Sequence, residues 1–321
     1  IHDGVAVYSA ADGAMKVKAA EVMLMITIGQ AGGSGGTYAV NGTFIYVGQT
    51  SDILAHIEDG VDIDTNDLTV YAGSLTTGIS WAGSITTGGQ SAIGVSGAVN
   101  NVDRTVQAVV GTTLPSYSSD LDPLENPVPP TTPGPGINAA NTLVVRALND
   151  GQIYAFSIAG SAPGGGSGNA SQEETDDPLD GVSLPILFED VAPSRGPPAS
   201  GNGIGIAGAV GINLISDTTL AYLSTSATVA ATDLTVEADN KTWLLSLTGG
   251  AVLARPSGDG AASSSSAIAG AFSLVIITQT TRALVFGPNL DVTRDMTVRA
   301  GRDGFAITLS IGAAGNFTGG K

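Results

Sequence analysis

A short pattern that returns five times along the chain constrains the fold more than any other feature of the sequence. The pattern is Leu or Met, any residue, Val, any residue and Ala, and its copies occupy 15–19, 68–72, 143–147, 234–238 and 296–300. The shortest spacing, from Met15 to Leu68, is 53 residues. Self-similarity at a spacing of a few tens of residues indicates a repeat architecture such as a solenoid or a propeller.

Three further elements accompany this pentapeptide. A second apolar segment follows each copy, at 26–28, 79–81, 156–158, 245–247 and 309–311. A third, glycine-containing element occupies 40–44, 95–99, 206–210 and 268–272, and a fourth is marked by Ala55, Ala108, Ala221 and Ala283. From the glycine of the third element to the alanine of the fourth, the steps are 13, 11, 13 and 13 residues. Such regular spacing predicts one structural unit repeated along the chain.

The pentapeptide alternates between apolar and polar positions. Its Leu, Val and Ala positions are apolar or small, whereas the residue before the alanine is Lys18, Tyr71, Arg146, Glu237 or Arg299. A period of two is typical of a strand with one buried face and one wet face. The sequence therefore predicts an all-β fold, a parallel β-helix (β-solenoid), in which each repeat buries its apolar face against its neighbours.

We expect residues 1–321 to form a single elongated β-solenoid. With strands about 4.8 Å apart along the axis, roughly a dozen coils would make a rod of about 60 Å. The chain starts and stops partway through the repeat, and an uncovered coil favours stacking of another coil upon it. The sequence therefore predicts either a fragment of a longer protein or a subunit that polymerises end to end.

Two segments interrupt the repeat. Residues 112–141 form a Pro-rich insertion with seven prolines, a density incompatible with a central strand. Residues 161–203 form an acidic Gly/Pro-rich insertion that begins near a Gly/Ser tract. Insertions in a solenoid often lie on its binding face, and they also protect sheet edges from pairing. Both interpretations stay open, so the sequence predicts two loop insertions without a role for either.

Charge and cysteine content exclude several classes of function. The formal net charge is -17, so the chain offers no positive field for nucleic acid or anionic lipid. The chain has no cysteine, which excludes disulfides and thiolate chemistry. The longest apolar run, 267–277, is far shorter than the ~20 residues needed to cross a bilayer, so no membrane insertion is expected.

Four aspartates in one short stretch are the candidate metal ligands. Asp59, Asp62, Asp64 and Asp67 place oxygen ligands at a density that could hold Ca²⁺. An EF-hand is excluded because Asp67 stands where that loop requires glycine. The competing interpretation is a solvated turn. Asp176 and Asp177 form a second and weaker candidate, and no other cofactor is indicated.

Catalytic machinery is sparse in the sequence. Its two histidines are His2 and His56, which gives little material for a catalytic triad or a multi-histidine metal site. His56 follows the alanine of the fourth element, where the other copies carry Val109, Tyr222 and Leu284, so we expect a strand-surface histidine. Residues 203–208 match a dinucleotide-binding expression but lie inside the repeated Gly/Ala strand. We therefore predict no catalytic residues and no enzymatic activity.

The units at 68–72, 206–210 and 234–238 resemble repeats of large bacterial surface proteins, the leukotoxin-like filamentous adhesins and the filamentous haemagglutinin-type β-helices. The resemblance implies a parallel β-helix exported to the bacterial cell surface or medium. It implies a structural or adhesive module that associates with itself into fibres and contacts a surface glycan or protein. The alternative is a carbohydrate-active β-helix enzyme, a polysaccharide lyase or hydrolase, and a third candidate is a tandem β-sandwich adhesin.

Overall fold

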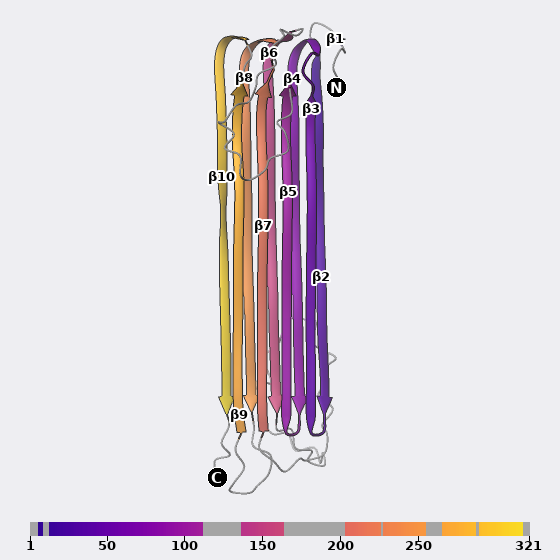
Figure 1. Ribbon diagram of the computed structural model, residues 1–321, viewed down its shortest axis with the longest axis vertical. Coiled ribbons are helices and arrows are strands. Elements are labelled where there is room, and N and C mark those ends of the chain that lie inside the picture. Colours follow the sequence, from indigo (N-terminus) through magenta and orange to yellow (C-terminus); the bar gives the residue numbers. More distant parts are fainter. Residues whose placement is uncertain are drawn as a thin grey trace, which may run out of the picture.

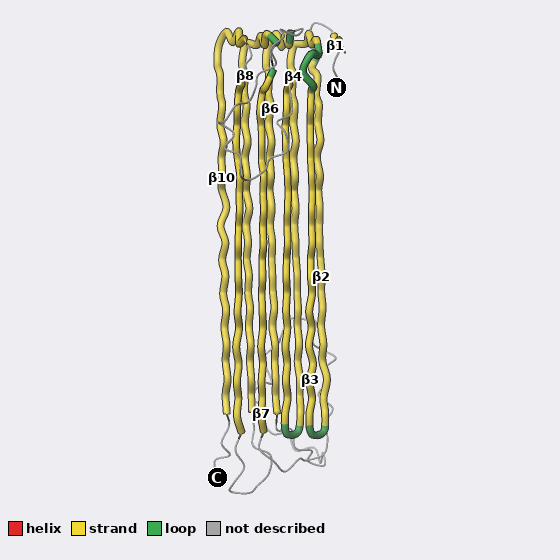
Figure 2. The backbone as a smooth tube through the Cα atoms, viewed as in Figure 1, coloured by secondary structure: helices red, strands yellow, loops and turns green. Residues whose placement is uncertain are grey.

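The computed structural model describes residues 6–8, 13–111, 136–163, 203–225, 227–254, 265–286 and 289–316. These residues form long β-strands joined by short connections, and no helix occurs among them (Figure 2). None of these described segments therefore contains a helix suited to crossing a membrane. The all-β prediction is confirmed.

The strands alternate along the chain between two parallel sheets (Figure 1). Sheet A contains β1 (Ala6–Tyr8), β2 (Ala14–Gly35), β4 (Asp62–Gly88), β6 (Ile137–Pro163), β8 (Thr228–Ala254) and β10 (Asn289–Asn316). Sheet B contains β3 (Tyr38–Ile57), β5 (Ser91–Gly111), β7 (Gly203–Ser224) and β9 (Ser265–Phe286). Each coil is one strand of sheet A followed by one strand of sheet B, which is the topology of a β-solenoid.

The register of the strands confirms that the five pentapeptides are equivalent. Met15 pairs with Leu68, Leu68 with Leu143, Leu143 with Leu234, and Leu234 with Met296. The alanines of the fourth element pair in the same way, from Ala55 through Ala108 and Ala221 to Ala283. All these pairings are parallel, so the tandem β-sandwich is wrong for the described residues.

Two of the four elements were aligned two residues out of place in some copies. Ile79 pairs with Tyr154 rather than Phe156, and Leu245 pairs with Ile307 rather than Leu309. In the third element Val40 pairs with Ile93 rather than Val95. A shift of two residues keeps every side chain on the same face of the strand, so neighbouring apolar rows are interchangeable in a sequence pattern.

The predicted rod of a dozen coils is wrong, because each repeat makes only one coil. The first two elements of a repeat lie on one strand of sheet A, and the other two lie on the following strand of sheet B. The strands β2 to β10 contain 20 to 28 residues, or roughly 65–90 Å of extended chain. Five long strands side by side measure only about 20 Å along the solenoid axis. The molecule is therefore a flat slab whose longest direction follows the strands (Figure 1).

An apolar core fills the space between the first halves of the sheet A strands and the last parts of the sheet B strands. Leu68, Leu143 and Leu234 are completely buried there, as are the Val and Ala of the same three pentapeptides. Ala108 and Ala221 of sheet B belong to the same cluster. The pentapeptide thus supplies one wall of the core, as its alternation predicts.

The two predicted insertions lie mostly outside the described residues. The structure does not describe 112–135 of the first segment or 164–202 of the second. Residues 137–141 and 161–163 belong to β6, and β7 begins at Gly203. The strands therefore extend into the outer parts of both segments as they were predicted.

Candidate functional site

The four aspartates of the predicted calcium site lie along the turn between β3 and β4 and the start of β4. Asp59 accepts a hydrogen bond from the hydroxyl of Thr225, in the equivalent turn after β7. Asp64 accepts one from Asn138 Nδ2 at 3.0 Å, on the neighbouring strand β6. Among the described residues, no three acidic or histidine side chains are grouped as a metal site requires. The structure therefore does not bring these aspartates together around a cation.

Asp67 lies at a bulge that recurs along sheet A. The pairing of β4 with β6 shifts between Thr65 and Asp67, and equivalent shifts occur in the next two pairings. Its carboxylate accepts hydrogen bonds from Thr142 Oγ1 at 2.6 Å and Asn141 Nδ2 at 2.9 Å. The hydrogen bond from Thr142 is the main reason that the pKa of Asp67 lies below its ordinary value. Asp67 thus joins adjacent coils rather than facing its neighbouring aspartates.

Two other sequence motifs are also placed by the structure. His56 lies on the outer side of β3, where its Nε2 is 2.7 Å from the carbonyl oxygen of Gly111. It pairs with Val109, which pairs with Tyr222, so the predicted strand-surface position is confirmed. Residues 203–208 form the first part of β7, a continuous strand that runs to Ser224. Since no helix follows, they do not form a dinucleotide-binding turn.

A buried ion pair is the strongest polar feature of the interior. Arg104 of β5 and Asp217 of β7 pair side by side in sheet B, and both side chains are fully inaccessible. Arg104 donates from Nε to Asp217 Oδ1 and from Nη2 to Oδ2, each at 2.8 Å. Two parallel charge-assisted hydrogen bonds of this kind give the pair a fixed geometry.

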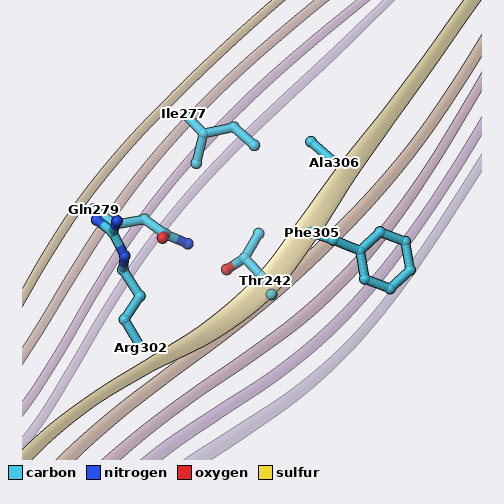
Figure 3. Close-up of a pocket in the computed structure, with 7 residues that line it drawn as sticks. Thr242, Ile277, Gln279, Arg302, Phe305 and Ala306 are labelled. Atoms are coloured by element: carbon cyan, nitrogen blue, oxygen red, sulfur yellow. The ribbon is translucent and has the colours of Figure 1, made fainter.

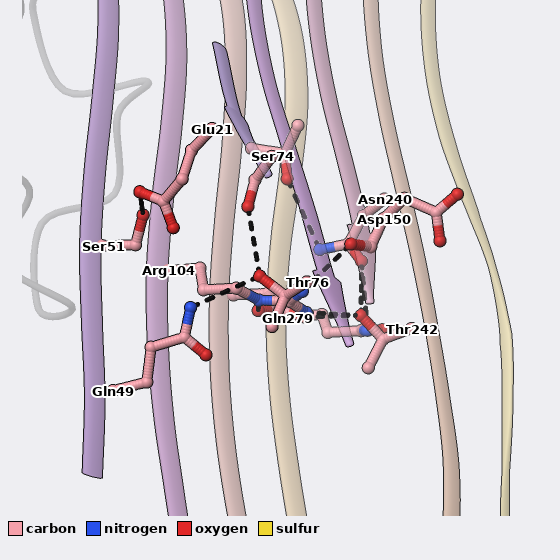
Figure 4. Close-up of polar contacts among 12 residues, drawn as sticks. Glu21, Gln49, Ser51, Ser74, Thr76, Arg104, Asp150, Asn240, Thr242 and Gln279 are labelled. Atoms are coloured by element: carbon pink, nitrogen blue, oxygen red, sulfur yellow. Dashed lines mark hydrogen bonds and ion pairs between the residues drawn. The ribbon is translucent and has the colours of Figure 1, made fainter. Parts of the chain in front are cut away.

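Sheet A completes the coordination of this pair from the opposite side of the interior (Figure 4). The hydroxyl of Thr242 donates to Asp217 Oδ2 at 2.6 Å, and the carbonyl oxygen of Asp150 accepts from Arg104 Nη1 at 3.3 Å. Gly151 lies against the guanidinium so closely that a Cβ atom would collide with it. The absence of a side chain at this position therefore admits the arginine.

Further polar side chains extend this layer toward both ends of the solenoid. Gln49 Nε2 donates to Thr76 Oγ1 at 3.3 Å, and Ser51 donates to Glu21 at 2.7 Å near one end (Figure 4). Gln279 Nε2 donates to Asn240 Oδ1 at 3.3 Å near the other end. These groups bond to one another across the two sheets, so the layer joins the sheets and does not face an open cleft.

Sequence reasoning missed this polar layer. Arg104 and Asp217 are 113 positions apart, and neither belongs to a repeated motif. The available signal was their position relative to the fourth-element alanines, since both stand four residues before Ala108 and Ala221 respectively. Equal spacing from an aligned alanine places both residues side by side and on the same face.

An outer ladder of charges crosses sheet A beside the apolar core. Glu237 of β8 lies between Arg146 of β6, with Nε 3.1 Å from Oε2, and Arg299 of β10, with Nε 2.9 Å from Oε1. Arg299 also bonds to Asp239. Partial burial by itself would raise the pKa of Glu237, but the hydrogen bond from Arg299 and the two positive charges lower it below its ordinary value. On the far side of the sheet, the ammonium of Lys18 lies 5.5 Å from the centre of the Tyr71 ring.

Apolar side chains cover the outer face of sheet A farther along the same strands. The second apolar segments form two complete rows across all five long strands, and we call these rows the outer apolar patch. The first row contains Ile26, Ile79, Tyr154, Leu245 and Ile307, and the second contains Ile28, Trp81, Phe156, Leu247 and Leu309. On the outermost strands β2 and β10 these side chains are about half exposed, from 49% for Leu309 to 57% for Ile26. The sequence revealed these segments but not the face to which they point.

Aromatic contacts tie the outer face together along its rows. The rings of Trp81 and Phe156 are 5.4 Å apart, and those of Trp243 and Phe305 are 4.4 Å apart. Both pairs join neighbouring strands at equivalent positions. Such pairs stabilise adjacent strands and hold the side chains in a fixed array.

The interior is open at the last coil. A cavity of about 310 Å³ lies there, lined by Thr242 of β8, by Ile277 and Gln279 of β9, and by Arg302, Gly304 and Ala306 of β10 (Figure 3). Arg302 occupies the row of Asn240, so this cavity is the exposed end of the polar layer. Its lining is mostly polar and it contains no carboxylate, which provides no general acid or base for glycoside cleavage.

The chain was compared with protein-family models, with curated proteins and with solved structures, and none of them matches it.

Proposed function

We propose that the chain is a structural or adhesive module of a large secreted bacterial surface fibre, and that its two end coils are covered by further coils of the same kind. The fold supports this proposal because a parallel solenoid can be extended by adding strands to both sheets. The bonding of the interior ion pairs and polar side chains to one another supports a mechanical role. The resemblance to filamentous adhesin repeats gives the bacterial surface as the expected location.

The observation that carries the proposal is the unfinished state of the two end coils. Val298 of β10 stands in the row of the completely buried Val236, yet it is 44% exposed. Met296 is 47% exposed in the row of the buried Leu234. At the other end, Met15 and Val17 are only partly buried against the core. Each end therefore exposes a core surface that another coil would bury.

Unpaired backbone adds to the tendency of these ends to stack. In the described part of sheet A, β2 and β10 are the outermost long strands, with 22 and 28 residues. A long flat edge strand is a template for pairing with another strand. Stacking would give a ribbon about 65–90 Å wide that grows by about 4.8 Å for each coil.

In this proposal the broad outer faces make the contacts with other molecules. Their charged ladder and apolar rows repeat at the spacing of the strands, so a glycan or protein partner would meet the same contact several times. The alternative, a carbohydrate-active enzyme, requires carboxylates that converge on a cleft. Incubation with a polysaccharide panel, with and without Ca²⁺, tests that alternative, since release of sugars would support it.

An inward-facing charge on β10 tests the proposed stacking. Val298→Lys places an ammonium on the core surface of the end coil, whereas Thr297→Lys places the same charge on the outer face of the adjacent residue. We expect concentrated wild-type protein and Thr297→Lys to form ribbons with a 4.8 Å axial repeat by electron microscopy and fibre diffraction. Val298→Lys should remain as short particles. Equal assembly of both variants, or compact particles from the wild type at high concentration, would count against the proposal.

A further inference from the structure

We propose that the outer apolar patch of sheet A is an interface for a second copy of this chain, packed face to face about a two-fold axis. This contact lies on the broad face of the slab. It is separate from the end coils, so it does not depend on the stacking proposed above.

The size of the exposed patch fits a protein interface. Five strands about 4.8 Å apart, with outward side chains over some 25 Å of their length, give a face on the order of 600 Å². Two such faces would bury about 1,200 Å² in total, at the lower end of specific interfaces. The largest apolar patch of a typical monomer is about 300–600 Å² and is often functional.

The chemistry of the patch favours a second sheet over other occupants. Its two rows are aliphatic or aromatic, apart from the Tyr154 hydroxyl, so they have almost no groups to bond the hydroxyls of a polysaccharide. The net charge of -17 disfavours approach to an anionic membrane. Parallel strands in register make a flat, regular array, and two sheets with such faces pack by interdigitation about 10 Å apart.

The outer face of sheet B is a poorer match for this contact. It also has exposed apolar residues, among them Val40, Phe44 and Phe272. Glycines interrupt it, because Gly42 stands in one row with Gly208 and Gly270. The two rows of the sheet A patch contain no glycine and extend over five strands rather than four. Sheet A therefore presents the larger and more continuous surface.

The arrangement of charges selects the orientation. The ladder of Arg146, Glu237 and Arg299 lies to one side of the patch along the strands. A two-fold axis parallel to the solenoid axis superimposes the two patches while turning one copy end for end. The two charged ladders then lie at opposite ends of the pair, and neither is buried. Two-fold symmetry also closes the assembly, as in most homodimers.

The lack of cysteine allows a direct test by single-cysteine cross-linking. Tyr154→Cys places a thiol on the central strand of the patch, near the proposed axis, and Ile212→Cys places one on the outer face of sheet B. Both are made in the Val298→Lys background, so that stacking of end coils does not add to the signal. We expect mild oxidation to convert Tyr154→Cys to a disulfide-linked dimer and to leave Ile212→Cys monomeric. Dimers of Ile212→Cys, or mixed dimers when the two variants are combined, would overturn the sheet A pairing.

Sedimentation tests the same contact without a cross-link. Leu245→Lys places a charge in the patch, and Thr235→Lys places one on the outer face of the same strand outside it. We expect Leu245→Lys to raise the dimer dissociation constant at least tenfold and Thr235→Lys to change it less than threefold. A parent chain that stays monomeric at high concentration would overturn the proposal. Retention of that monomer on insoluble cellulose or zwitterionic vesicles, lost in Leu245→Lys, would assign the patch to a polysaccharide or a lipid instead.

Discussion

The two halves of each long sheet A strand bury opposite kinds of side chain. In the first half of β6, Leu143 and Val145 point into the core while Arg146 points outward. In the second half of the same strand, Ser157 is buried and the outward positions carry Tyr154 and Phe156. The strand continues without a change of face, so the inversion is a property of the sequence.

The interior compensates for this inversion with hydrogen bonds. Ser157 lies 2.9 Å from Ser96 across the interior, and Asn100 Nδ2 donates to Asn213 Oδ1 at 2.8 Å. Because buried polar groups are costly only when they lack partners, a polar interior can be as stable as an apolar one. The comparison teaches that one solenoid can free its apolar residues for external contacts wherever small polar residues bond across its interior.

The largest effect is expected where the polar interior contains charge. Arg104→Met leaves Asp217 buried without its counterion, which should lower the free energy of unfolding by about 3–5 kcal/mol. The double variant with Asp217→Leu removes both charges and should recover most of this loss. Urea denaturation followed by circular dichroism measures these differences. Arg146→Met, at an exposed ion pair, is the control, and an equal loss there would refute the distinction between interior and surface charge.

Much of this architecture could be predicted from the sequence, because the apolar core repeats. The pentapeptide predicted the strands, the buried face and the equivalence of Leu68, Leu143 and Leu234. The number of coils could not be read in the same way, since nothing in the spacing tells a bend from a continuous strand. The partnership of Arg104 and Asp217 depends on register, which becomes visible only after Ala108 and Ala221 are aligned.

The candidate surfaces were less predictable than the core. An apolar segment such as 79–81 has the same pattern whether its Ile and Trp face the interior or solvent. The deciding residues lie between them, since Ser80 and Ser84 are buried and have the small volume that the narrow interior accepts. The acidic run from Asp59 to Asp67 predicted a cation, but an extended strand separates its carboxylates and each meets a donor elsewhere.

A matched pair of leucines measures the difference between the two faces. Leu143→Ala creates a cavity at a completely buried position and should cost about 2–5 kcal/mol of unfolding free energy. Leu245→Ala shortens an outward side chain in the patch and should cost less than about 1 kcal/mol in the isolated monomer. Both are measured by urea denaturation at a concentration where no dimer forms. A larger loss for Leu245→Ala than for Leu143→Ala would contradict the assignment of inner and outer faces.

The smallest effect is expected in the charged ladder, and it should depend on pH. The pKa of Glu237 is lower in the folded chain than its ordinary value, because Arg299 donates to it and two arginine charges favour the carboxylate. Its stabilising contribution is therefore complete above the unfolded pKa of about 4.3 and is lost as pH falls through the folded pKa.

Glu237→Gln separates this contribution from other effects of acid. The unfolding free energy of the wild type should exceed that of the variant at pH 7, by less than the loss from Leu143→Ala. The gap should close as pH falls below about 4.3, since Glu237 then becomes neutral as well. Denaturation curves of both chains between pH 7 and pH 3 measure it. A gap that stays constant over this range would mean that Glu237 acts by packing rather than by its charge.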